Sequence, residues 1–212
     1  MTRSERTVRQ PGLNGAMPSD PVLLFLHGHY GDRDDLAWVA ERVPAPWRTV
    51  LLRAPLPLGD RFAWFHVADD GVRGASSSEA APAADGLLAW IDENLGDAVV
   101  GAIGWSQGGA TALQALRRAP RRLAFVVTLG GFTTLDGESG DAELAELRPP
   151  VFWGHGAKDD MITVDDIARM REFLPGHTTL TERVYPGVGH DLAPGMAEDA
   201  LRFVAAHTPG RD

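Results

Sequence analysis

Ser106 is the residue of this chain best placed to act as a nucleophile. It stands at the centre of residues 104–108, whose sequence GWSQG has the form G-x-S-x-G. Glycines in this pattern let the chain turn sharply and leave the serine hydroxyl exposed. Residues 98–103 form a short apolar run typical of a buried strand, and residues 109–118 are rich in helix-forming residues. Strand, tight turn and helix in this order predict a serine that attacks an acyl carbonyl.

A serine hydroxyl needs a nearby base to take its proton, and histidine suits because its pKa of about 6.5 lies near working pH. His190 follows the last predicted strand in a glycine-rich loop, where the base is expected to come last in chain order. A carboxylate should orient this histidine. Asp159 and Asp160 follow the preceding strand, and either could do so, while the other caps a helix or forms a turn.

Two backbone N–H groups would stabilise the oxyanion of the tetrahedral intermediate. The first is that of Gln107, the residue after the nucleophile. The second is expected from the loop after an early strand, here residues 27–31, and we assign it to His29.

Apolar runs alternate with helical patterns almost throughout the chain. Strands are expected at residues 22–26, 49–54, 98–103, 123–129, 150–155 and 180–185, and helices at 34–43, 86–95, 109–118, 163–174 and 194–207. Residues 55–85 show a weaker pattern typical of a functional or mobile connection, and 133–148 read as an acidic loop or short helix. This alternation predicts an α/β fold: a mostly parallel central sheet with helices on both faces and sites at the carboxyl ends of the strands.

The composition is that of an ordinary globular protein of 212 residues. We expect residues 1–20 to be a flexible lead and residues 21–212 to be a single domain. A formal charge of −9 argues against nucleic acid as a partner, and no apolar run approaches the about 20 residues that span a bilayer. The absence of cysteine leaves the compartment open. Because residues 1–20 contain no apolar signal segment, the expected location is the cytoplasm.

Several of these motifs occur in a familiar order. The first is HGHYGD at residues 27–32, followed by RAP at 53–55 and the pair Trp64 and Phe65. Then come GWSQGG at 104–109, HG at 155–156 with Asp159, and finally Tyr185, Gly187 and His190. Together they resemble the phospholipase/carboxylesterase family of small α/β-hydrolases, which includes the acyl-protein thioesterases. The resemblance covers residues 22–207. It implies an α/β-hydrolase fold with Ser106 as nucleophile, His190 as base and Asp159, rather than Asp160, as acid.

The expected activity is that of a serine carboxylesterase acting through an acyl-enzyme on short-to-medium acyl esters. An acyl thioesterase or lysophospholipase with the same triad is the alternative. No large cap domain, metal or cofactor is expected, and the partner is a small ester or acylated substrate without stable membrane insertion. The family contains monomers and homodimers. Trp64, Phe65 and Trp105 are candidates for the acyl pocket, and core packing is as good an explanation for each.

Two competing hypotheses come from other classes. His27, His29 and Asp32 could hold a catalytic zinc ion, although their spacing misses the H-x-H-x-D-H pattern and explains neither Ser106 nor His190. A non-catalytic binding module on a hydrolase fold is the second, because fold does not fix function.

Overall fold

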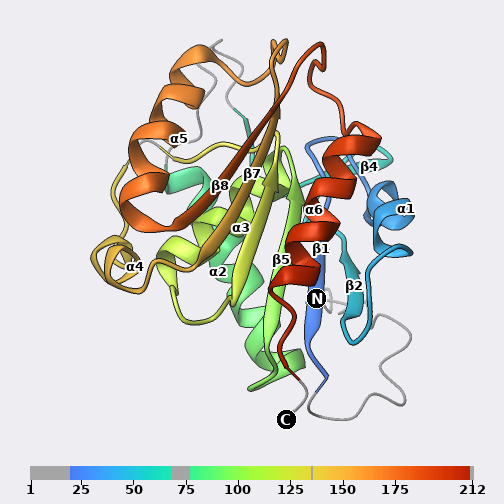
Figure 1. The fold of residues 1–212 in the computed structure, drawn as a ribbon, viewed down its shortest axis with the longest axis vertical. Helices are drawn as coiled ribbons and strands as arrows, with labels where there is room; N and C mark the ends of the chain where they lie inside the picture. The colour runs from blue at the N-terminus through green and yellow to red at the C-terminus, as the bar shows by residue number, and fades with distance from the viewer. Residues whose placement is uncertain (1–19, 68–76, 135, 211–212) are drawn as a thin grey trace, which may run out of the picture.

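Six strands form the central sheet of this protein, in the order β2-β1-β5-β6-β7-β8 (Figure 1). The structure is a computed structural model, and it describes residues 20–67, 77–134 and 136–210. The strands of the sheet are β1 (Val22–Leu26), β2 (Arg48–Leu52), β5 (Val100–Trp105), β6 (Phe125–Leu129), β7 (Pro150–Gly156) and β8 (Thr179–Tyr185). Every neighbouring pair is parallel, so the predicted parallel sheet is confirmed.

The continuous apolar run of β1 is explained by burial on both faces of the sheet. All five of its residues are buried. Val22, Leu24 and Leu26 belong to the hydrophobic core on one face, and Leu23 and Phe25 belong to the core on the other. A strand with two buried faces has no polar side to present, which is why the alternation of polar and apolar residues is missing.

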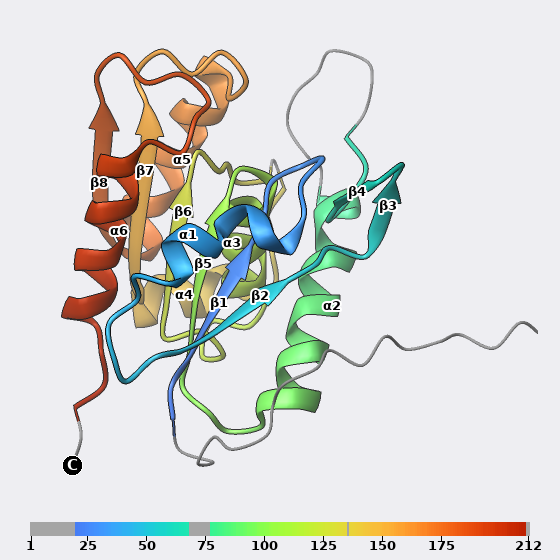
Figure 2. The same ribbon diagram turned by 90° about the vertical axis from the view of Figure 1, so that its right-hand side faces the viewer.

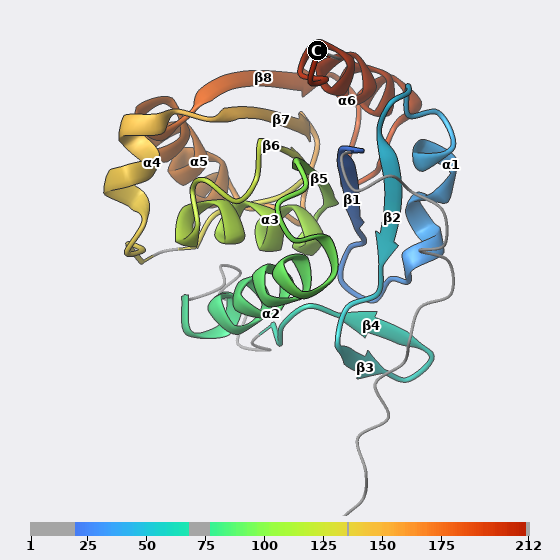
Figure 3. The same ribbon diagram turned by 90° about the horizontal axis from the view of Figure 1, so that it is seen from below.

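Helices cover both faces of this sheet (Figure 3). They are the 3-10 helix η1 (Arg33–Leu36), α1 (Ala37–Ala40), α2 (Ser77–Leu95), α3 (Gln107–Arg118), α4 (Asp141–Leu147), α5 (Val164–His177) and α6 (Pro194–Ala206). Apolar residues of α2, α3 and α5 complete the first core, and those of α1 and α6 complete the second. The described residues include no large cap domain, as expected.

The structure differs from the sequence-based expectation between β2 and α3. Residues 56–63 form a hairpin of two short antiparallel strands, β3 (Leu56–Leu58) and β4 (Arg61–Ala63), where the sequence showed no clear pattern. Helix α2 begins at Ser77, nine positions before the expected residue 86, and contains Pro82. The expected helix at 34–43 is shorter and is divided into η1 and α1. Three-residue strands and a proline in the first turns give too weak a local signal to predict either element.

The hairpin lies beside the loop that follows β1 (Figure 2). Gly31 in that loop and Phe62 in β4 form an antiparallel bridge, with N···O distances of 3.2 and 2.9 Å. The hairpin is therefore bonded to the loop after β1 at the carboxyl edge of the sheet. The loops after β5, β7 and β8 lie at the same edge.

Part of the expected organisation falls outside the described residues. This is true of the lead at residues 1–19 and of residues 68–76 in the long connection. Within the parts of the chain that are described, no helix is long and apolar enough to cross a membrane.

Candidate active site

Ser106 occupies the turn between β5 and α3 with an unusual backbone conformation. Its φ of 51° and ψ of −118° lie in a region that L-residues rarely adopt, which is typical of strain held at a functional turn. The Ser106 N–H donates to the carbonyl oxygen of Leu129 in β6 at 2.7 Å, so the turn is fixed to the sheet. Glycine is required at 108, because a Cβ there would lie 2.2 Å from the carbonyl oxygen of Leu26.

Ser106, His190 and Asp159 form a continuous hydrogen-bonded chain. The Nε2 atom of His190 lies 2.9 Å from Oγ of Ser106, and its Nδ1 atom lies 2.8 Å from Oδ2 of Asp159. Because ionised Asp159 can only accept, Nδ1 carries the ring proton and Nε2 is left to accept the serine hydroxyl proton. The arrangement can therefore activate a serine nucleophile.

Asp159 is held in place by more than the histidine. Its second carboxylate oxygen, Oδ1, accepts hydrogen bonds from the backbone N–H groups of Met161 and Ile162, each at 2.9 Å. The side chain is only 3% exposed, whereas the neighbouring Asp160 is exposed to solvent. The residue pattern left both aspartates open, and Asp159 is the one that contacts His190.

Trp105 packs against the ring of His190. The two ring centroids are 4.8 Å apart, with an interplanar angle of 35°. Gly130, after β6, has a φ of 56°, and a Cβ there would lie 3.0 Å from Trp105 and 3.4 Å from His190 Cε1. Trp105 thus packs against the histidine ring, and the missing side chain at Gly130 leaves room for both rings. The prediction that Trp105 lines an acyl pocket stays a prediction.

The loop after β1 lies directly against Ser106. A Cβ at Gly28 would be 3.5 Å from the Cβ of Ser106 and 2.8 Å from Cδ1 of Trp105. The loop is anchored by His27, whose ring is buried and whose Nε2 accepts the N–H of Ala54, after β2, at 3.0 Å. His29, the predicted donor of the second oxyanion N–H, is exposed in this loop.

The side chain of Gln107 joins the start of α3 to the segment after β4. Its Oε1 accepts the backbone N–H of Trp64 at 2.8 Å, and its Nε2 donates to the carbonyl oxygen of Phe65 at 2.8 Å. Gln107 is 2% exposed. The sequence pattern assigned a role only to the backbone N–H of Gln107 and did not predict this role of its side chain, although a glutamine next to the nucleophile offers both a donor and an acceptor.

Trp64 and Phe65 are packed into the first core. They are 6% and 2% exposed, and the Phe65 ring packs edge-to-face on Phe132 at 6.4 Å. Core packing, which explained these aromatic residues as well as an acyl-pocket role did, accounts for their burial. The pocket role of these two residues stays a prediction.

Two of the three residues proposed as zinc ligands, His27 and Asp32, are engaged in other contacts, and the third, His29, is exposed. The Nδ1 of His27 faces the Gly28 carbonyl oxygen at 2.7 Å, and burial lowers the pKa of this histidine. Both carboxylate oxygens of Asp32 accept from the Arg53 guanidinium, at 2.7 and 2.8 Å, and this pair lowers the pKa of Asp32. Among the described residues, no three His, Cys, Asp or Glu side chains are grouped to hold a metal ion. The zinc hypothesis therefore has no ligand set in this part of the chain.

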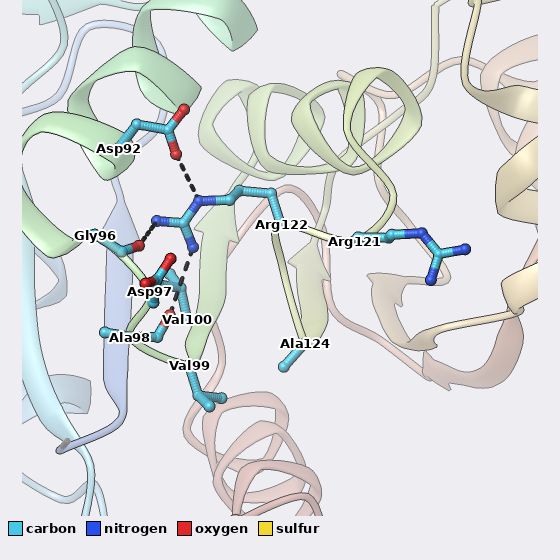
Figure 4. A pocket seen from close by; sticks show the side chains of 9 residues that line it. All are labelled: Asp92, Gly96, Asp97, Ala98, Val99, Val100, Arg121, Arg122 and Ala124. Carbon is cyan, nitrogen blue, oxygen red and sulfur yellow. Dashed lines mark hydrogen bonds and ion pairs between the residues drawn. The ribbon is translucent and has the colours of Figure 1, made fainter.

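A hollow of about 580 Å³ lies at the other end of the sheet, at the amino-terminal ends of β5 and β6 (Figure 4). Its most central side chain, Arg122, already donates to Asp92 and to the carbonyl oxygens of Gly96 and Ala98. β5 separates this hollow from Ser106 by roughly 20 Å, the length of a six-residue strand. It is therefore separate from the hydrogen-bonded chain of Ser106, His190 and Asp159.

The sequence of this chain matches one protein family over almost its whole length. The model of the phospholipase/carboxylesterase family covers residues 13–208. Among curated relatives, acyl-protein thioesterase 1 of Saccharomyces cerevisiae is 27% identical over 105 residues, covering 48% of this chain and 46% of the relative. Acyl-protein thioesterase 1 of Debaryomyces hansenii is 29% identical over 104 residues, covering 48% and 45%. The chain thus spans about half the length of the curated relatives it matches.

Solved structures show the same fold at low sequence identity. The carboxylesterase of Bacillus cereus superposes with a TM-score of 0.75 at 21% identity, covering 89% of each chain. Acyl-protein thioesterase 2 of Zea mays superposes with a TM-score of 0.74 at 21% identity, covering 95% of this chain and 97% of its own. At this identity, the likeness establishes the fold alone.

Proposed function

This chain belongs to the phospholipase/carboxylesterase family and has the α/β-hydrolase fold, and from that premise we propose that it is a serine hydrolase of carboxylic esters. The observation that carries the proposal is the chain of hydrogen bonds from Asp159 through His190 to Oγ of Ser106. It lies at the carboxyl edge of a parallel sheet, where sites in such folds are found.

In the acylation step, Oγ of Ser106 attacks the acyl carbonyl carbon while its proton moves to Nε2 of His190. The carbonyl electron pair becomes the oxyanion of a tetrahedral intermediate. His190 then gives the proton to the leaving oxygen, the carbon–oxygen bond of the ester breaks, and the alcohol departs. Ser106 is left as an acyl ester. Asp159 holds the imidazole in the tautomer that accepts at Nε2 and stabilises the imidazolium.

Deacylation repeats these transfers with water. His190 takes a proton from water as the hydroxyl oxygen attacks the acyl carbon, and then returns it to Oγ of Ser106 as that bond breaks. The products are the carboxylic acid and the free enzyme. Every proton is carried by the chain's own residues, so the proposed reaction uses no cofactor or metal.

The backbone N–H groups of Gln107 and His29 are the proposed donors to the oxyanion. Gln107 is the first residue of α3, where the N–H groups of the first turn lack an intrahelical acceptor and the helix dipole favours negative charge. Loss of one such donor typically costs about 10²–10³ in kcat.

A thioester or lysophospholipid substrate is the second candidate. Both curated relatives described above are named acyl-protein thioesterases, and the matching family is described as phospholipase/carboxylesterase. The same acylation step would then release a thiol, or an alcohol carrying a phospholipid headgroup. Short-to-medium acyl esters stay the first proposal. We also propose that residues 21–212 form a single domain. The protein is proposed to be a monomer or a homodimer and to be located in the cytoplasm.

Hydrolysis of p-nitrophenyl esters from acetate to palmitate tests this function, with wild type and Ser106→Ala measured side by side. We expect activity in the wild type alone and covalent labelling of Ser106 by a fluorophosphonate. The acyl chain length with the highest activity then indicates the size of the acyl site. A parallel series of acyl thioesters measures the second candidate. Equal activity in both proteins would contradict the serine mechanism. A folded wild type that resists labelling would favour a binding module.

A further inference from the structure

Trp64 contacts both segments that carry the proposed oxyanion donors. Its indole Nε1–H donates to the carbonyl oxygen of His27, in the loop after β1, at 2.8 Å. Its backbone N–H donates to Oε1 of Gln107, at the start of α3, also at 2.8 Å. The indole lies beside the His27 ring, with centroids 5.6 Å apart. One residue outside the central sheet thus connects two loops that leave different strands.

We propose that Trp64 is a positioning residue that fixes the separation and direction of the two oxyanion donors, an inference that rests on the proposed function. One donor is the backbone N–H of Gln107, whose side chain Trp64 contacts. The other is the N–H of His29, two residues beyond the carbonyl that Trp64 holds. An oxyanion needs both N–H groups at hydrogen-bonding distance at once, so a small change in their separation lowers transition-state stabilisation.

The contacts of Gln107 make this connection stiff. Both polar atoms of the Gln107 side-chain amide are hydrogen-bonded, Oε1 to the Trp64 N–H and Nε2 to the Phe65 carbonyl oxygen, so the side chain cannot rotate without losing buried hydrogen bonds. Close packing of Gly108 on the Leu26 carbonyl holds the same helical turn from the side of β1. The first turn of α3 is therefore fixed to the hairpin segment as well as to the sheet.

Burial of a tryptophan does not by itself explain why Trp64 makes these two hydrogen bonds. Trp153 is also buried, at 0% exposure, yet its indole nitrogen has no hydrogen-bond partner among the described residues. Trp64 is only 6% exposed, so little of its aromatic surface is available to line an acyl pocket. Its two hydrogen bonds are made instead to His27 and Gln107, which lie in the two segments that carry the proposed oxyanion donors.

Trp64→Phe is the sharpest test, because it removes the indole N–H and keeps an aromatic ring. Trp47→Phe is the matched control: Trp47 is also buried, and its Nε1 donates to Thr208 at 2.9 Å, in a different core. With a p-nitrophenyl ester, we expect Trp64→Phe to lower kcat about tenfold or more with KM within about twofold, since oxyanion contacts act in the transition state. Trp47→Phe should keep the wild-type kcat.

A transition-state analogue gives a readout that a purely structural role would not change. A trifluoromethyl ketone forms a tetrahedral adduct with the serine, so its Ki should rise in Trp64→Phe in proportion to the loss of kcat/KM. Gln107→Met removes the other contact of Trp64 and should show the same pattern. It provides the test if Trp64→Phe does not fold.

The outcomes separate this inference from the proposed function. An active wild type in which Trp64→Phe and Gln107→Met both keep kcat and inhibitor affinity would overturn the positioning role alone. A rise in KM with kcat unchanged would also overturn the positioning role, and it would favour a role for Trp64 in binding the acyl group. A wild type without Ser106-dependent hydrolysis would overturn the proposed function and this inference with it.

Discussion

The Nδ1 atom of His27 lies 2.7 Å from the carbonyl oxygen of Gly28, so the ring of one residue holds the peptide plane of the next. Because Nε2 accepts the N–H of Ala54, Nδ1 must carry the proton that is donated to Gly28. A trans peptide places its N–H opposite its C=O. The N–H of His29, which shares that plane, therefore points away from the His27 ring.

This arrangement predicts a loss of stability in mild acid. Burial lowers the pKa of His27 from its ordinary 6.5, so the folded state favours the neutral ring that can accept from Ala54. As pH falls through 6.5, the unfolded chain takes up the proton first, and the stability that is present at neutral pH is lost. Urea unfolding between about pH 5 and pH 8 should show this slope, reduced in His27→Gln. The same slope in both proteins would assign the titration to other groups.

Exchange of each aspartate for asparagine should separate the two candidates for the acid. Asp159→Asn would present an amide to His190 and favour the wrong tautomer, and we expect kcat to fall by about 10⁴. Asp160→Asn is the matched control, and it should keep kcat because Asp160 is exposed to solvent. The measurement is ester hydrolysis at saturating substrate. A larger loss in Asp160→Asn would reassign the acid.

A methyl group at the start of α3 should be far more harmful than one near the end of α5. In Gly108→Ala the new Cβ would meet the Leu26 carbonyl oxygen at 2.2 Å, and backbone must move. We expect about 1–3 kcal/mol of lost stability together with lost activity. In Gly176→Ala the Cβ meets nothing within 4 Å, and helix propensity favours alanine by up to about 1 kcal/mol. Thermal melts and kcat measure both; equal melts would contradict the clash.

Local sequence patterns predicted the elements around Ser106, because β5, the turn and α3 are consecutive in the chain. The pattern after β7 could not choose between Asp159 and Asp160, since the choice depends on the direction of a side chain in the folded loop. The contacts of Trp64 were beyond prediction for another reason. Its partners, His27 and Gln107, are 37 and 43 positions away, and the hairpin that places it has strands of only three residues.

A buried arginine fixes the loop that follows β6, whose first residue, Gly130, lies against His190. Arg117 is 2% exposed, and its guanidinium donates to both carboxylate oxygens of Asp141 and to the hydroxyls of Thr133 and Thr134 in that loop. A second basic residue, Arg121, pairs with Glu143 on the surface instead.

Truncation of these two arginines should therefore have unequal effects. Arg117→Met leaves Asp141 without its bidentate cation and removes the hydrogen bonds that Arg117 donates to Thr133 and Thr134, and we expect a cost of about 3–5 kcal/mol in the free energy of unfolding. Activity should fall as well, because the loop whose Gly130 lies beside His190 loses its anchor. Arg121→Met removes an equally long side chain from an exposed ion pair, which contributes little to stability. Urea unfolding and kcat distinguish the two, and similar values for both variants would show that the Arg117 contacts do not anchor the loop.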